Sequence, residues 1–358
     1  TFGAPLGLGT PVGEASRCAF QVYNLAAEDQ IQPGDLIEIK HDPGTGEIPR
    51  FTGNAYSVEI SWSTVERSVT TVAASGTLAA IGRSIDGMAY PPTIDQMSDG
   101  ERITYYLDRA FTPSGTPVVY SVDPGTVQIA ERDNVTEGVA STLDLIEQTA
   151  NAGMGIVVDQ PDGSVTYFDR FHARNTSPAY TLDASQILAE ISTTITTETL
   201  INSAAVTFAL PGMTGSAYND ASVAVFGEYP GGGDLPLADF DSAQDIADEY
   251  VFRYSFPRYS IPELTIDERL SPELLPEVEL GQVIAIQGLP QPTRSSMYAV
   301  VQNYRETWRD EDSWQIELGL VDARWWGRAL TWGGVNVAET WDTWDPDMSW
   351  AEIGRAHV

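Results

Sequence analysis

The residues that could support catalysis are few and scattered. No G-x-x-x-x-G-K-[ST] phosphate loop, G-x-S-x-G nucleophile elbow or H-E-x-x-H zinc motif occurs in the chain. His172 lies three residues from Asp169 and could be half of an acid–base pair, although an exposed histidine at a strand end is the better interpretation. Asp162 precedes a turn glycine, and its spacing from Asp159 and Asp169 does not match a calcium loop. The sequence therefore predicts no catalytic, cofactor-binding or metal site.

Tryptophan is the residue type whose distribution most needs an explanation. Trp308 and Trp314 flank a hairpin turn, which predicts a place in the core or at the rim of a barrel. Six more lie beyond the last expected strand, where they would form a large apolar patch if left in water. They are candidates for docking a partner protein, for packing on the chain's own barrel, or for stacking on sugars: Trp325, Trp326, Trp332, Trp341, Trp344 and Trp350.

The composition excludes several classes of partner. The 358 residues include 51 acidic and 19 basic side chains, for a formal net charge of -32. This charge argues against binding a nucleic-acid backbone or an anionic lipid surface. It is typical of a highly soluble protein, or of a wall that must repel a passing polyanion such as DNA. Some carboxylate pair could reach glycosidase spacing by chance, but nothing in the sequence singles one out.

The remaining composition adds little chemistry. Cys18 is the single cysteine, so the chain has no disulfide framework. No segment approaches the roughly 18 apolar residues of a membrane span. The N-terminal residues lack the features of a secretion signal, and the missing initiator Met suggests processing or an excerpted N-terminus.

Residues 1–85 read mostly as short strands separated by turn signals, which predicts a first small β-barrel. Tyr56, Val58, Ile60 and Trp62 alternate at period two and are expected to share one face of a strand.

Residues 86–182 predict an α+β insert. Ser98 and Glu101 have the spacing of a capping box, which indicates a helix near 100–111. A second helix is expected near 137–152, with Thr136 as its cap, followed by a hairpin near 156–170.

Residues 183–324 predict a second β-barrel with a helix near 241–254. A Gly-rich stretch, 211–237, is expected to be an exposed and mobile loop. GQVIAI, which begins at Gly281, resembles GDLIEI, which begins at Gly34, and suggests that the two barrels are related. The predicted fold class is α+β, mostly β: two small related β-barrels, an α+β insert between them and a Trp-rich C-terminal extension, 325–358.

One stretch of the chain, FTGNAYSVEISW followed by VTTVAASGTLAAIGR, resembles a motif of minor tail proteins from long-tailed, siphovirus-type phages of actinobacteria. The family pattern is F-x-G-x-V … W … V-T-V-x-A-x-D-x-L-A-x-L-G-R, and Ser75-Gly76 stands where the family has Asp. VVDQPDGSVTYFDR, INSAAVTF and ELGQVIAI continue the resemblance, so that it covers most of the chain. The single lysine, Lys40, also fits a GC-rich host. The matching residues of the motif are Phe51, Gly53, Trp62, Val69, Val72, Ala74, Leu78, Ala79, Gly82 and Arg83.

The resemblance implies a fold similar to the baseplate hub of contractile-tailed phages. It implies a homotrimer whose six barrels form a ring below the tail tube, at the tail tip of the virion. The expected partners are the distal tail protein, the tape measure protein and further minor tail proteins, with DNA passing through the lumen without specific binding.

We expect no catalysis, no cofactor, no lytic domain and no membrane anchor, and we expect the Trp-rich end to dock neighbouring tip proteins. The alternatives are a carbohydrate-binding tail protein that recognises host cell-wall glycans through the same tryptophans, and a secreted acidic hydrolase.

Overall fold

A computed structural model gives the structure of the chain. The structure describes residues 2–3, 15–24, 29–42, 46–64, 67–83, 93–112, 115–133, 140–173, 176–187, 191–208, 213–257, 259–289, 296–308 and 314–323. Within these residues the protein is mostly β, with two curled sheets and a smaller helical content. No helix in the described part of the chain is long and apolar enough to cross a membrane.

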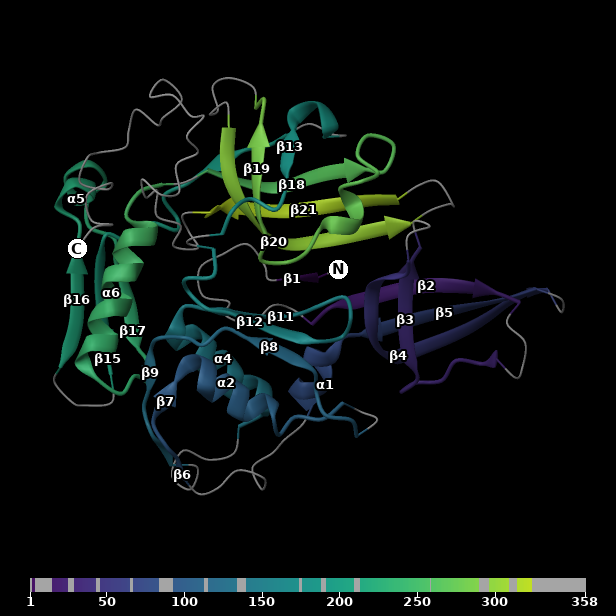
Figure 1. The fold of residues 1–358 in the computed structure, drawn as a ribbon, viewed down its shortest axis with the longest axis horizontal. Helices are drawn as coiled ribbons and strands as arrows, with labels where there is room; N and C mark the ends of the chain where they lie inside the picture. The colour runs from purple at the N-terminus through teal and green to yellow at the C-terminus, as the bar shows by residue number, and fades with distance from the viewer. Residues whose placement is uncertain are drawn as a thin grey trace.

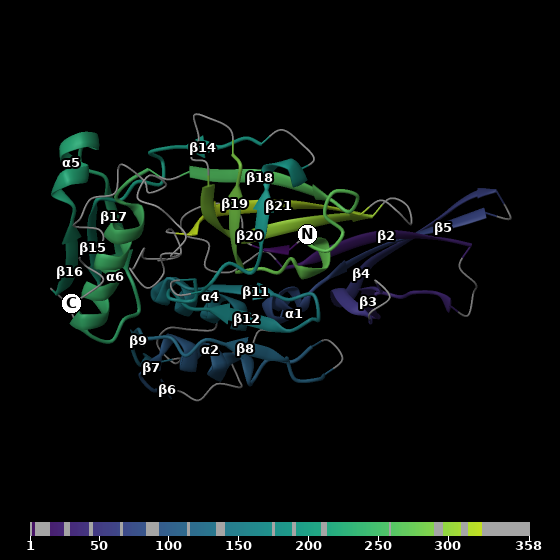
Figure 2. The ribbon, with the colours of Figure 1, turned by 45° about the horizontal axis from the view of Figure 1, so that its top comes forward.

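Four antiparallel strands form the first sheet, in the order β2-β5-β4-β3 (Figure 1). β4 outruns β3, whose pairing stops at Leu36 opposite Asn54. Beyond that point β4 pairs with β5 on one side, and no described strand pairs with its other side. In Figures 1 and 2 the far ends of β4 and β5 point away from the rest of the molecule. The strands are β2 (Arg17–Tyr23), β3 (Leu36–His41), β4 (Ile48–Thr64) and β5 (Arg67–Ser75).

The second sheet has the order β13-β19-β20-β21-β18-β14, and the N-terminal strand β1 adds to the free side of β20. Its first and last sides approach each other, because Ile187, just after β13, bridges to Ile266 of β18. The sheet therefore curls into a half-barrel. Its elements are β1 (Phe2–Gly3), β13 (Thr181–Asp183), β14 (Thr194–Ile195), β18 (Tyr259–Asp267), β19 (Val283–Gln287), β20 (Ser296–Trp308), β21 (Trp314–Asp322) and the short 3-10 helices η2 (Ala184–Gln186) and η3 (Leu275–Glu277).

The second sheet repeats the topology of the first. The order β19-β20-β21-β18 matches β3-β4-β5-β2 strand for strand, in the same order along the chain. A bulge follows Ala55 in β4, and a bulge follows Val301 in β20. Gly34 and Gly281 both have positive φ, and their N–H groups donate to the Ala55 and Val301 carbonyls at 2.8 and 2.9 Å. These matches confirm the relation predicted from GDLIEI and GQVIAI.

The bulge in β4 changes one detail of the predicted strand. Ala55 lies opposite Ala74 and Ser57 lies opposite Ala73, so Tyr56 is the extra residue of the bulge. The prediction that four alternating residues share a face is therefore wrong for Tyr56. Past the bulge, Val58, Ile60 and Trp62 lie opposite every second residue of β5 and share one face.

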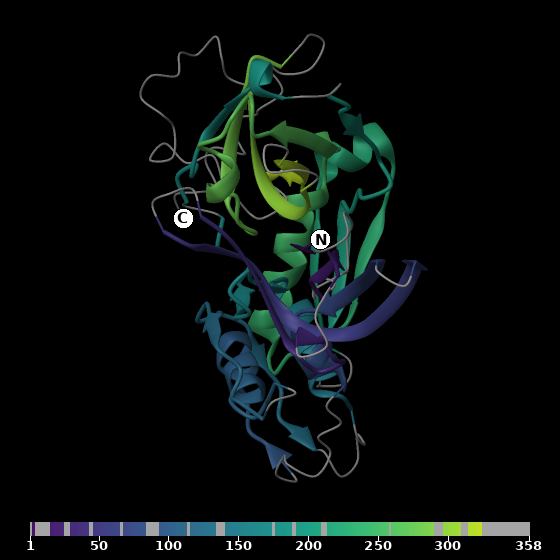
Figure 3. The same ribbon diagram turned by 90° about the vertical axis from the view of Figure 1, so that its right-hand side faces the viewer.

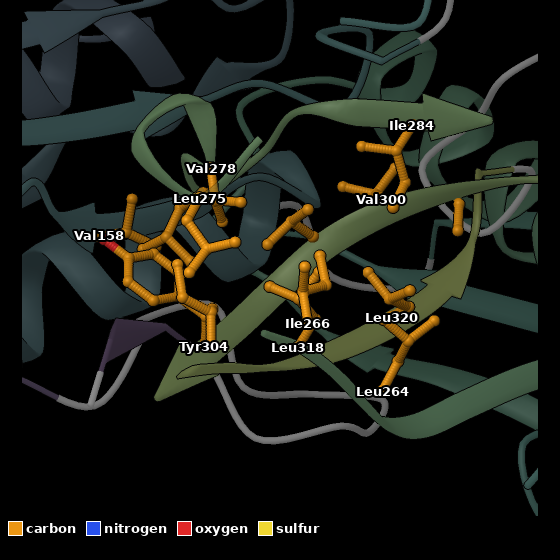
Figure 4. Packing of buried hydrophobic residues seen from close by; sticks show 14 of the residues in the cluster. Val158, Leu264, Ile266, Leu275, Val278, Ile284, Val300, Tyr304, Leu318 and Leu320 are labelled. Atoms are coloured by element: carbon orange, nitrogen blue, oxygen red, sulfur yellow. The ribbon is translucent and has the colours of Figure 1, made fainter. Parts of the chain in front are cut away.

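One hydrophobic core joins the two sheets and the insert (Figure 4). The second sheet contributes most of it, including Ile284, Val300 and Leu318, while Phe51 comes from the first sheet and Val158 from the insert. Because residues from all three regions fill the same core, their relative positions are fixed by apolar burial.

The insert packs helices α1, α2 and α4 against a three-stranded sheet of order β11-β12-β8 and has a core of its own. It lies at the end of the molecule opposite the second sheet in Figures 1 and 3. Its elements are α1 (Thr77–Arg83), β6 (Thr93–Ile94), β7 (Met97–Ser98), α2 (Asp99–Leu107), β8 (Tyr120–Val122), β9 (Gln128–Ile129), β10 (Arg132–Asp133), α4 (Thr142–Gly153), β11 (Ile156–Asp159) and β12 (Val165–Phe168).

The local signals in the insert were mostly correct. Ser98 caps α2 in a capping box with Glu101, as predicted. The hairpin predicted near 156–170 is the antiparallel pair of β11 and β12. The cap of α4 is Ser141, in a capping box with Asp144, so the prediction of Thr136 as the cap is wrong.

Residues 203–254 form a third unit, in which helix α6 covers one face of a three-stranded sheet of order β16-β15-β17. The expected exposed loop over 211–237 is therefore wrong. In its place the described residues form a strand, a short helix capped by Asn219, and a strand made of PGGGD. The helix predicted near 241–254 is confirmed as α6. The elements are β15 (Ser203–Thr207), β16 (Thr214–Tyr218), α5 (Asp220–Phe226), β17 (Pro230–Asp234) and α6 (Phe240–Tyr254). The domain boundaries at 85, 182 and 324 stay predictions.

Candidate assembly interface

The tryptophans predicted to lie in the barrel form a stacked pair at the end of the β20–β21 hairpin. Trp308 and Trp314 lie directly opposite each other, with ring centroids 4.5 Å apart and planes 19° apart. Trp314 is 2% exposed and Trp308 is 44% exposed, so one ring belongs to the core and the other to the rim, as predicted. The six candidate docking residues Trp325, Trp326, Trp332, Trp341, Trp344 and Trp350 lie outside the described residues.

This pair meets the first sheet where β3 ends and β4 begins. The His41 ring lies 4.6 Å from Trp314 and 5.4 Å from Trp308. The Arg50 guanidinium lies 5.4 Å from the centre of the Trp314 ring and pairs with Glu306 of β20. We call these five residues, His41, Arg50, Glu306, Trp308 and Trp314, the junction.

The ion pair of the junction is withdrawn from water. The side chains of Arg50 and Glu306 are 3% and 9% exposed. Arg50 Nε donates to Glu306 Oε1 at 3.0 Å, and Arg50 Nη1 donates to the Pro276 carbonyl at 3.2 Å. Because both charges would be costly to bury alone, the pair ties the tip of the second hairpin to one position on the first sheet.

A buried carboxylate joins the first sheet to the insert. Asp159 of β11 accepts hydrogen bonds from Ser16 N and Oγ, at 2.9 and 3.1 Å, and from Leu78 N at 2.8 Å. Burial raises the pKa of Asp159 to about 6. The group therefore holds the start of β2 and the start of α1 on the same strand of the insert.

A second buried carboxylate organises the interior of the insert. Asp99 accepts hydrogen bonds from Val127 N at 3.0 Å and from the Tyr167 hydroxyl at 2.5 Å. Burial raises the pKa of Asp99 from its ordinary value. Each carboxylate accepts hydrogen bonds from other segments of the fold, which gives it a structural role.

The candidate acid–base histidine pairs with a different partner from the one considered in the sequence. His172 Nδ1 lies 2.9 Å from Asp123 Oδ2, and the Asp169 backbone N–H donates to the same oxygen. Burial acts to raise the pKa of Asp123, but the hydrogen bonds from His172 and Asp169 lower it overall. The Phe168 ring, 4.2 Å away, covers the histidine, which is 30% exposed and thus less exposed than expected.

The three aspartates considered as calcium ligands accept structural hydrogen bonds. Asp162 accepts from Ser164 N at 2.9 Å and holds the hairpin turn, as predicted. Asp159 is the buried carboxylate described above, and Asp169 accepts from Phe171 N at 2.8 Å. Among the described residues, no group of three or more His, Cys, Asp or Glu side chains could hold a metal ion.

No local signal in the sequence points to the junction, because Arg50 and Glu306 lie far apart along the chain and neither belongs to a motif. The internal repeat offered an indirect signal, because it relates positions in the two sheets. Trp308 ends β20, and Trp62 lies two residues before the end of β4; each follows a bulge, and the strand pairing places them at equivalent positions.

Comparison with known proteins identifies the architecture. No family model matches the chain, and no curated protein matches its sequence. The tail protein from Neisseria meningitidis MC58 superposes with a TM-score of 0.62 at 12% identity, over 91% of this chain and 92% of that chain. The 43 kDa tail protein of prophage MuSo2 from Shewanella oneidensis gives 0.58 at 11% identity, over 90% and 93%.

Prophage tail protein gp18 from Listeria monocytogenes EGD-e gives a TM-score of 0.56 at 11% identity, over 86% of this chain and 85% of that chain. The similarity spans nearly the full length of each of the three structures, so it includes both curled sheets and the units between them. This chain therefore has the fold of phage tail proteins.

Proposed function

We propose that the chain is a structural subunit of a phage tail, and that it forms a homotrimeric hub ring at the tail tip, below the tail tube. The observation that carries this proposal is the internal repeat. One chain presents two sheets of the same topology, with a bulge and a positive-φ glycine at equivalent positions. Three such chains in a ring would offer six equivalent sheets to a six-fold tube.

The shared fold supports the tail assignment. Three tail proteins have this architecture over at least 85% of their own length. The resemblance of FTGNAYSVEISW to minor tail proteins of actinobacterial, siphovirus-type phages refines the proposal to that group of phages. In this role the distal tail protein, the tape measure protein and further minor tail proteins are its neighbours.

The charge of the chain suits a ring around passing DNA. A net charge of -32 gives the lumen of such a ring a negative potential, which repels the DNA backbone and prevents specific binding. The proposed role needs no catalysis, since its work is to hold neighbouring proteins in register. The buried carboxylates Asp99 and Asp159 fit this role, because each holds segments of the fold together.

The direct test is electron cryomicroscopy of virions that carry this protein. A three-fold ring of this chain directly below the tail tube would support the proposal. Placement of the chain in the capsid or along the tail shaft, or its absence from the particle, would overturn it.

A further inference from the structure

The outer part of the first sheet repeats a surface that is buried elsewhere in the same chain. We call residues 18–23 of β2, 57–62 of β4 and 68–73 of β5 the arm. In the pairing of β3 with β4, Ile37 lies opposite Gly53, and in the pairing of β19 with β20, Ile284 lies opposite Ala299. Counting from these pairs through the two bulges gives three equivalences: Val58 with Tyr304, Ile60 with Glu306 and Trp62 with Trp308.

Within one chain, the second-sheet members of these equivalences are covered by the first sheet. Tyr304 is fully buried, Glu306 pairs with Arg50, and Trp308 lies beside His41. The hairpin tip of one sheet therefore sits on the strand ends of the other sheet. This is the junction described above.

The equivalent surface of the arm is covered at its inner end, where Val58 packs against the shared core, but not at its outer end. Trp62 is 69% exposed, Val58 and Ile60 are half-buried, and the arm points away from the other elements in Figures 1 and 2. Glu59 is the only charged residue in 18–23, 57–62 and 68–73, although the chain as a whole is strongly acidic. A charge-depleted apolar face with an exposed tryptophan has the composition of an interface core.

The chain also contains a matching place for this face. Counted from the pairs Ile37–Gly53 and Ile284–Ala299, Gly288, just after β19, corresponds to His41. Ser296, at the start of β20, corresponds to Arg50, which is the extra residue of a second bulge in β4. Where the arm has Ile60 in place of Glu306, the second sheet has Ser296 in place of Arg50. Both charges of the ion pair are thus replaced together, and the two surfaces remain compatible.

We propose that the arm of one copy of this chain docks on the second sheet of the next copy, with Trp62 placed over the end of β19 and the start of β20. This inference rests on the proposed ring and names its subunit contact. The junction within a chain and the arm contact between chains would then alternate around the ring. The contact joins two different surfaces, so it can propagate from copy to copy until the ring closes.

The first test compares two exposed aromatic residues of the arm. Trp62→Ala removes the proposed anchor, while Tyr23→Ala removes a side chain that is 67% exposed on the opposite face of the same three strands. Mass photometry over a concentration series should show a trimer for the wild type and for Tyr23→Ala. For Trp62→Ala the concentration needed for assembly should rise at least about tenfold, as for an interface hot spot. Circular dichroism and thermal unfolding check that both variants are folded.

The second test locates the contact by cross-linking in a Cys18→Ser background. Ile60→Cys on the arm and Gln287→Cys at the end of β19 should give covalent oligomers with a short bismaleimide. Tyr23→Cys combined with Gln287→Cys should give no covalent oligomers, so that only monomers appear on a denaturing gel.

The outcomes separate the two proposals. A trimer that persists unchanged in Trp62→Ala, without the Ile60–Gln287 cross-link, would overturn the arm contact and leave the hub proposal standing. Equal loss of assembly in Trp62→Ala and Tyr23→Ala would also overturn it. A wild-type protein that stays monomeric at all concentrations would overturn both.

Discussion

At the scale of residues, the buried charges of this protein connect separate parts of the fold. Arg50 and Glu306 join the two sheets, and Asp159 joins the first sheet to the insert. A charge removed from water is tolerated when its hydrogen bonds are satisfied, but it becomes costly when its partner is removed. The stability of the chain should therefore depend strongly on a few polar residues.

Arg50→Met should destabilise the protein by about 3–5 kcal/mol, because it leaves Glu306 buried without its partner. The matched control is Arg305→Met, since Arg305 is 59% exposed and its pair with Glu317 should contribute less than about 1 kcal/mol. Chemical denaturation of both variants measures the difference. The double variant Arg50→Met/Glu306→Leu should recover part of the loss. Equal destabilisation by Arg50→Met and Arg305→Met would contradict the proposed role of the buried ion pair.

Asp159 predicts a specific pH dependence. Burial raises its pKa from 3.8 to about 6, so between these values the folded state holds a proton that the unfolded chain releases. The contribution of this group to the free energy of unfolding is thus largest below pH 4 and falls by roughly 3 kcal/mol as the pH rises through 6. Asp159→Asn cannot titrate. The free energy of unfolding of the wild type, relative to that of the variant, should therefore increase as the pH is lowered from 7 to 4. A pH-independent difference in denaturation experiments would contradict the prediction.

At the scale of elements, the sequence predicted the features that depend on local patterns and missed those that depend on long-range pairing. Ser98 and Glu101 predicted the start of α2, because a capping box is a local hydrogen-bond pattern. Strand β17 was missed because PGGGD has no alternation and no β-branched residue; its conformation depends on pairing with β15. Asn219 was the available signal for α5, since its side chain accepts from Ser222 N.

The start of α2 offers a test of packing against propensity. At a helix position without close neighbours, Ala is favoured over Gly by about 1 kcal/mol. In Gly100→Ala, however, the new Cβ would lie 2.3 Å from the Asp123 carbonyl oxygen and 2.4 Å from atoms of Pro124. The net effect should be a loss of about 1–3 kcal/mol.

The control for this prediction is Gly82→Ala in α1. There the nearest contact of the new Cβ is the end of the Leu143 side chain at 3.0 Å, which can rotate away, so stability should be unchanged or slightly higher. Thermal unfolding of the two variants compares them. An increase in stability for Gly100→Ala would contradict the close approach of α2 to residues 123–124.

At the scale of the whole molecule, the two sheets and the insert share one core, and the repeat relates one sheet to the other. The sequence predicted this relation from GDLIEI and GQVIAI, because the turn glycine and the following strand are local features. It could not predict the junction, since the contact of Arg50 with Glu306 exists only after both sheets have folded and packed. The role of the C-terminal tryptophans in docking neighbouring proteins stays a prediction.

A reconstruction of the tail tip from virions that contain this protein tests the proposed ring most directly. We expect a ring of three copies below the tail tube. Six curled sheets should alternate around an open channel, with each arm on the second sheet of the next copy. A tail tip in which this chain is a monomer, or in which its two sheets do not occupy equivalent positions around the channel, would contradict the proposed ring.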